Sequence, residues 1–120
     1  MNAMSLPTFV MVLVSVAMIC CGQLLFKEVG NRLAVGMEPT QLQVVWVAAV
    51  AIGIYGLATL LWIHILRSVP LTRAYPFMAL SFVIVPLGSI LFFAEHVRPQ
   101  YFIGTALIVA GVVVTTLSNP

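Results

Sequence analysis

The chain consists of four long apolar runs separated by short polar gaps. The first run, residues 8–26, contains no charge and would form a helix about 28 Å long, close to the ~30 Å hydrocarbon thickness of a bilayer. The gaps are too short to hold a separate folded unit. The pattern therefore predicts one all-α membrane domain over residues 1–120, with spanning helices over residues 8–26, 44–66, 71–94 and 101–117.

The connections between the runs indicate how the helices are arranged. Residues 27–43 form the longest gap, and their glycines, proline and mixed charges indicate a loop. Residues 67–70 leave room only for a hairpin, so we expect the second and third helices to be antiparallel neighbours. Residues 95–100 form another tight turn before the fourth helix.

The third run contains two prolines, Pro76 and Pro86. Each proline removes a backbone donor and crowds the carbonyl four residues earlier, so we expect this helix to bend. A bend at Pro86 is consistent with a hinge that moves, and equally with a static kink.

The composition is that of an integral membrane protein. Apolar residues make up 62% of the chain and charged residues 7%, against roughly 45–50% and 25% in soluble domains. This excludes a hidden soluble catalytic domain and a basic nucleic-acid surface. The five Lys and Arg residues divide three to two between the two membrane sides, so either orientation, or both together, stays open.

Motifs for catalysis are missing from the sequence. No Ser/His/Asp set, metal-ligand cluster or phosphate-binding glycine loop occurs, and His64 and His96 fall at opposite membrane faces. Cys20 and Cys21 are adjacent within the first run, where a thiol behaves as a small apolar side chain. We therefore expect neither an enzyme nor a bound cofactor or metal.

Gln23 and Lys27 are the first candidates for a binding site. They lie four residues apart, on one face of the first helix. An amide in hydrocarbon needs partners, so we expect Gln23 to face the bundle or a polar cavity. Lys27 can reach the interface and bind an anionic headgroup. An interhelical glutamine beside a helix-capping lysine explains the same spacing equally well.

Arg73 and Tyr75 form a second candidate pair at the start of the third run. Arginine offers a fork of donors that suits phosphate oxygens, and Arg67 lies at the same membrane face. Arginines beside a hairpin also serve as general interface anchors, so both interpretations stay open.

The fourth run has features of an association face. Gly104 and Gly111 are seven residues apart, and small residues let another helix approach closely. Four short helices enclose little volume, so a substrate pathway would require a second copy or a paralogous chain.

Three stretches resemble the small multidrug resistance fold of the drug/metabolite transporter superfamily. They are Gly22-Gln23-Leu24-Leu25-Phe26-Lys27, Val69-Pro70-Leu71-Thr72-Arg73-Ala74-Tyr75-Pro76 and Ala110-Gly111. The resemblance implies a four-helix bundle that dimerises around a substrate chamber with alternating access. Proton-coupled members carry a glutamate eight residues before the lysine, and that place is Ile19 here, so proton-coupled export of cationic drugs is not supported.

The chain also resembles the paired small subunits that act as flippases for aminoarabinose-phosphoundecaprenol. The similarity rests on Gly-Gln-Leu-x-x-Lys from Gly22, Val-Pro-x-x-x-Ala-Tyr-Pro from Val69 and Glu-x-Val-x-Pro from Glu95. It implies a flippase subunit for a polyprenyl-phosphate-linked sugar in the bacterial inner membrane, in a homodimer or a heterodimer with a paralogue.

That resemblance implies roles for five residues. Lys27 and Arg73 would attract the phosphate, Gln23 and Tyr75 would bond the headgroup, and Glu95 would bind a cation or an amino sugar. Other readings of the sequence are a carrier for another lipid-linked sugar or for undecaprenyl phosphate, an exporter of small cations or metabolites, and a non-transporting scaffold subunit.

Overall fold

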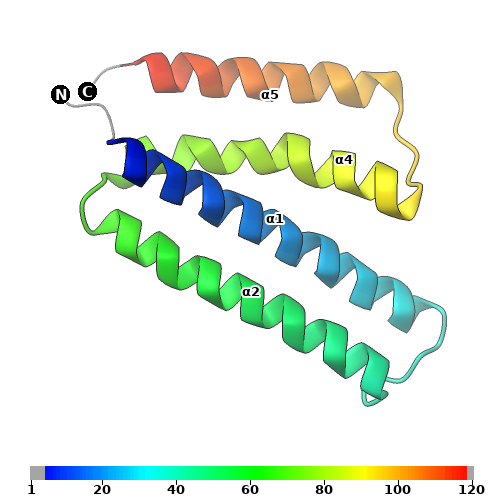
Figure 1. Cartoon of the computed structure of the whole chain (residues 1–120). Coiled ribbons are helices and arrows are strands. Elements are labelled where there is room, and N and C mark those ends of the chain that lie inside the picture. The colour runs from blue at the N-terminus through cyan, green and yellow to red at the C-terminus, as the bar shows by residue number, and fades with distance from the viewer. Residues whose placement is uncertain (1–4, 119–120) are drawn as a thin grey trace.

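A computed structural model describes residues 5–118 of the chain (Figure 1). The described elements are all helical: α1 (Leu6–Ala34), α2 (Leu42–Leu66), α3 (Leu71–Ala74), the 3₁₀ helix η1 (Tyr75–Leu80), α4 (Ser81–Phe93) and α5 (Pro99–Leu117). Four helical segments are long and apolar enough to cross a membrane, because α3, η1 and α4 together form one of them. The predicted all-α membrane architecture is confirmed.

Helix α1 is longer than the sequence predicts. We expected a loop from residue 27, but α1 continues to Ala34, and residues 27–34 are therefore helical. Leucine, lysine, glutamate and arginine are strong helix formers, and the pair Glu28–Arg32 has the stabilising spacing of four. These residues outweigh Gly30, and the loop begins only at Val35, next to Gly36 with its φ of +96°.

The contact between α1 and α2 is the most extensive in the fold. The buried residues of α2 recur every seven residues, as in an antiparallel coiled coil. The two central ones are alanines, which let the helix axes approach closely. The buried positions of α2 are Val44, Ala51, Ala58 and Ile65.

The hairpin brings α2 and the third segment together only at its own end. There Val12 of α1 packs with Ile65, Val69 and Ala74 in the main buried cluster. Beyond this cluster α1 lies between α2 and α4, which barely touch each other in the described part of the chain (Figure 1). The expectation that the second and third helices are neighbours is therefore wrong along most of their length, because a short hairpin fixes only the ends that it joins.

The third segment changes its helical geometry rather than forming one α-helix. A single α turn is followed by six residues of 3₁₀ helix, with Pro76 in its first turn, and then by α4. Helix α4 continues through Pro86. The change in geometry therefore lies at Pro76 and not at the deeper proline.

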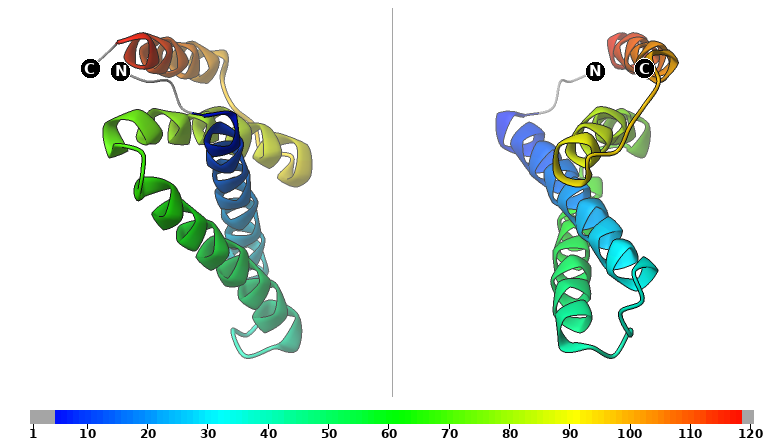
Figure 2. Two further views of the ribbon diagram at one scale, coloured as in Figure 1. Left: turned by 60° about the vertical axis from the view of Figure 1, so that its left-hand side comes forward. Right: turned by 90° about the vertical axis from the view of Figure 1, so that its right-hand side faces the viewer.

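The four spans make a flat assembly that measures 53 × 36 × 17 Å. Figure 2 shows that α4 and α5 run across α1 and α2 at a steep angle. Helix α5 packs mainly on η1, and every residue from Pro99 to Leu117 stays at least partly exposed. The smallest dimension, 17 Å, is less than two helix diameters of about 10–12 Å each, so α1 has open faces between its neighbours.

Candidate functional site

One side of α1 is buried near the hairpin and becomes exposed further along the helix. Val12 and Val16 are almost fully buried, whereas Gln23 and Lys27, on the same side of the helix, are exposed. The hairpin cluster covers the first part of this face, because Val12 packs there, but leaves the second part open. We define the polar face of α1 as Gln23 and Lys27.

The residues on either side of Gln23 fix α1 between its two neighbours. A Cβ added at Gly22 would lie 3.0 Å from Cδ2 of Tyr55 in α2. A Cβ added at Gly88 of α4 would lie 2.7 Å from Cδ1 of Leu24. Successive residues on a helix are about 100° apart, so Gln23 falls between the contacts to α2 and to α4.

The position of Gln23 differs from the sequence expectation. We expected its amide to face the bundle or a polar cavity, but in this single chain the side chain is exposed. The physical reason is the flat arrangement, in which α2 and α4 lie on opposite sides of α1 and neither covers the face between them.

Lys27 and Glu95 come together although they are 68 positions apart in the sequence. Lys27 Nζ lies 3.6 Å from Glu95 Oε2, and the two side chains are 50% and 41% exposed. Ala94 directs Glu95 back toward α1, because its left-handed conformation (φ 54°, ψ 34°) ends α4. An ion pair of this exposure contributes about 0.2–1 kcal/mol to stability.

Arg73 and Tyr75 lie at the other end of the molecule. The neighbouring Phe77 stacks edge-on against Phe9, with ring centroids 5.6 Å apart, near the start of α1. Phe9 and Lys27 are separated on α1 by eighteen residues, or about 27 Å. The five candidate residues therefore form two groups at opposite ends of the spans, and the structure does not unite them in one site.

One residue that the sequence analysis does not single out, Tyr55, packs beside the polar face of α1. Tyr55 is half-buried against Gly22, and its ring centroid lies 5.6 Å from that of Phe26. Tyr55 could have been recognised in the sequence because it lies in the middle of an apolar run, where a tyrosine brings a polar hydroxyl into the membrane.

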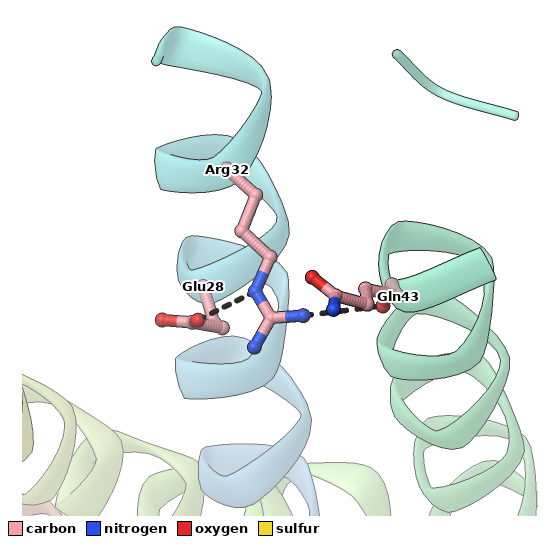
Figure 3. Close-up of polar contacts among 3 residues, drawn as sticks. All are labelled: Glu28, Arg32 and Gln43. Carbon is pink, nitrogen blue, oxygen red and sulfur yellow. Dashed lines mark hydrogen bonds and ion pairs between the residues drawn. The ribbon is translucent and has the colours of Figure 1, made fainter. Parts of the chain in front are cut away.

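Arg32 holds the end of α1 against the start of α2 (Figure 3). Its Nε donates to Glu28 Oε2 at 2.7 Å, and its Nη1 donates to the carbonyl oxygen of Gln43 at 3.2 Å. The spacing of Glu28 and Arg32 is the signal for a helix in the sequence, but Gly30 between them favours a loop. Their contacts are structural, and they leave Lys27 to interact with Glu95.

Comparison with known proteins identifies the family. The sequence profile of the EamA-like transporter family matches residues 1–117. The chain belongs to the EamA-like transporter family. This EamA-like protein is therefore a multi-pass membrane transporter protein, as the sequence predicted.

Curated relatives of this EamA-like protein occur in enteric bacteria. Proteins from Shigella flexneri serotype 5b (strain 8401), Escherichia coli O139:H28 and Escherichia coli K12 are each 35% identical to it over 93 residues. The match covers 78% of this chain and 82% of each relative. Each relative is named a probable 4-amino-4-deoxy-L-arabinose-phosphoundecaprenol flippase subunit ArnE. No solved structure matches the chain.

Proposed function

We propose that this EamA-like protein is a subunit of a flippase that moves a polyprenyl-phosphate-linked sugar across the bacterial inner membrane. The first candidate for the cargo is aminoarabinose linked to undecaprenyl phosphate. The observation that carries the proposal is the polar face of α1, where an exposed amide and an exposed lysine lie together at the end of a long apolar run. The names of the curated relatives support this choice of cargo.

Such a cargo suits a small membrane protein. Its polyprenyl tail can stay in the lipid, so the protein has to shelter only the phosphate and the sugar. Lys27 would attract the phosphate, and the amide of Gln23 would donate to and accept from sugar hydroxyls.

The second group of candidate residues would meet the headgroup at the opposite membrane surface. Arg73 and Tyr75 lie at the hairpin end, and the Tyr75 side chain is largely exposed there. In this proposal the headgroup moves between two binding positions. One is formed by Lys27 and Gln23 at one end of α1, and the other by Arg73 and Tyr75 at the opposite end.

A partner subunit would complete the route. The flat chain leaves Gln23 uncovered, and an amide facing hydrocarbon without a partner is unfavourable. A second copy or a paralogous chain placed over this face would enclose the headgroup between two polar surfaces.

Translocation in reconstituted vesicles tests the proposal. Hydrogen bonds to charged groups contribute about 1.5–3 kcal/mol, so we expect Lys27→Ala to slow headgroup translocation about tenfold or more. Gln23→Ala should have a smaller effect in the same direction. Arg98→Ala, which removes an exposed cation from the turn before α5, is the matched control and should retain the rate.

Unchanged translocation in both the Lys27 and Gln23 variants would reject the assigned site. Mass spectrometry of lipid that copurifies with the wild-type protein identifies the cargo in the same preparation. Recovery of drug-like cations or small metabolites in place of a polyprenyl phosphate would favour the exporter.

A further inference from the structure

Helix α2 has one face that no other part of the described chain covers. Its buried residues pack on α1, and α2 lies at the edge of the assembly (Figure 1). Because successive residues are about 100° apart, the side of the helix that points away from α1 is formed by another set of residues, all of them exposed. We define the outer face of α2 as Ala49, Gly53, Gly56, Leu60, Ile63, His64 and Arg67.

The hairpin end of this outer face is basic. His64 and Arg67 lie three residues apart, so their side chains project from adjacent turns on one side of the helix. Both are exposed, and within residues 5–118 no carboxylate forms an ion pair with either of them. All three acidic residues of the chain, Glu28, Glu38 and Glu95, lie toward the opposite end of the spans. A guanidinium and an imidazole N–H are therefore presented together to whatever lies against this end of α2.

The middle of the outer face can be approached closely by a hydrocarbon chain. A Cβ added at Gly53 or at Gly56 would meet nothing within 4 Å. Gly56 precedes Arg67 by eleven residues, which correspond to about 17 Å of helix. Half of the ~30 Å hydrocarbon layer is about 15 Å, so an acyl chain whose phosphate lies at Arg67 would end close to Gly56.

We propose that the outer face of α2 binds an anionic phospholipid of the surrounding bilayer, with its phosphate on Arg67 and His64 and an acyl chain along Gly56. Arginine offers two parallel donors to phosphate oxygens, and the imidazole adds another. A headgroup with net negative charge is preferred to a zwitterionic one, because no Asp or Glu lies at this end to pair with an ammonium group. The inference concerns a lipid of the membrane rather than the cargo, and it does not depend on the proposed function.

Charge favours a lipid over a second copy of the chain as the occupant. Two copies packed in parallel through this face would bring their Arg67 side chains together, and like charges repel. Two antiparallel copies would place each Arg67 beside Leu42, Val45 and Trp46, which offer no carboxylate. An anionic headgroup supplies the missing negative charge and leaves the basic pair in the headgroup layer.

Native mass spectrometry of the full-length, detergent-purified protein measures the headgroup preference. The probes are dioleoyl phosphatidylglycerol and dioleoyl phosphatidylcholine, which have the same chains and differ in net charge. We expect the wild-type protein to bind phosphatidylglycerol more tightly. A cationic side chain near the membrane surface contributes a factor of about five to the binding of an anionic lipid, so Arg67→Gln should lower the ratio about fivefold. His64→Ala should lower it less, and Arg67→Lys should largely retain it.

Arg98→Gln is the matched control, because it removes an equally charged, exposed residue at the opposite end of the spans. It should leave the ratio unchanged. Equal binding of the two lipids by the wild-type protein, binding of neither, or an equal fall in Arg67→Gln and Arg98→Gln would overturn the inference. Photolabelling locates the chain: phosphatidylglycerol with a diazirine near the end of one acyl chain should label residues 49–60 of α2 more than residues 104–114 of the exposed α5. Equal labelling of the two helices would contradict a site on α2.

Other occupants of the outer face give different results. Loss of bound phosphatidylglycerol on addition of one equivalent of undecaprenyl phosphate would assign this face to the polyprenyl cargo. A lower dimer fraction in Gly53→Leu or Gly56→Leu would assign it to a second copy. Either result would overturn the inference. Failure of translocation in the vesicle assay would contradict the flippase function and leave the phospholipid site standing.

Discussion

Two glycines determine how closely α1 approaches its neighbours. Gly22 admits the ring of Tyr55 from α2, and Gly88 admits the side chain of Leu24 toward α4. The contacts differ in stiffness, because an aromatic ring in packed surroundings yields less than the end of a leucine side chain. Gly22, the first residue of the motif in α1, therefore has a packing role, and the exposed Gln23 is the member left for binding.

A substitution at Gly22 should reveal this close contact. Alanine at an open helical position stabilises by up to about 1 kcal/mol over glycine, and we expect this gain for Gly53→Ala, where nothing lies within 4 Å. In Gly22→Ala the contact with Tyr55 should reverse the gain, since overpacking costs about 1–3 kcal/mol. Unfolding free energies of both variants in mixed micelles measure the difference, and equal values would contradict the predicted contact.

At the scale of the element, η1 sets how α4 faces α1. A 3₁₀ helix turns about 120° per residue and rises about 2.0 Å, against about 100° and 1.5 Å in an α-helix. Over the six residues of η1 the differences amount to about 120° of rotation and about 3 Å of length. An unbroken α-helix would therefore turn Gly88 away from α1.

Replacing Pro76 should produce this rotation. Pro76→Ala restores a backbone donor, so we expect η1 to convert toward α-helix and Gly88 to move away from Leu24. A disulfide between cysteines at positions 24 and 88, in a background with Cys20 and Cys21 replaced by alanine, reports their proximity. Cross-linking should fall severalfold in Pro76→Ala and persist in Pro86→Ala, because α4 continues through Pro86. Undiminished cross-linking in Pro76→Ala would show that proline does not maintain the 3₁₀ geometry.

At the scale of the whole molecule, α5 is the span with the least cover. Its glycines at 104 and 111 have open space where a Cβ would stand. This arrangement fits the association face expected from the sequence, since the face is available to another chain.

A bulky residue on this face should weaken association without unfolding the chain. We expect Gly111→Leu to lower the dimer fraction severalfold in cross-linking and native mass spectrometry. Val113→Leu adds one methylene at another exposed position of α5 and should leave the dimer fraction unchanged. A dimer that withstands Gly111→Leu would locate the subunit contact on another helix.

The sequence predicts the spans because apolar runs and polar gaps depend on local composition. It misplaces the end of α1 because Gly30 and the charges after Lys27 resemble a loop, whereas the Glu28–Arg32 pair stabilises a helix. It cannot predict that Gln23 is exposed, since that depends on which helices flank α1. The meeting of Lys27 and Glu95 is also hidden, because it requires the left-handed turn at Ala94.

The contact of Arg32 with Gln43 has a mechanical consequence. It ties α1 to α2 at one end, while the cluster around Val12 and Ile65 ties them at the other. Because α1 and α2 are held together at both ends, we expect them to move as one rigid unit. We therefore expect any movement between the spans to turn about η1 and to carry α4 and α5, with the Lys27–Glu95 contact lying farthest from that axis.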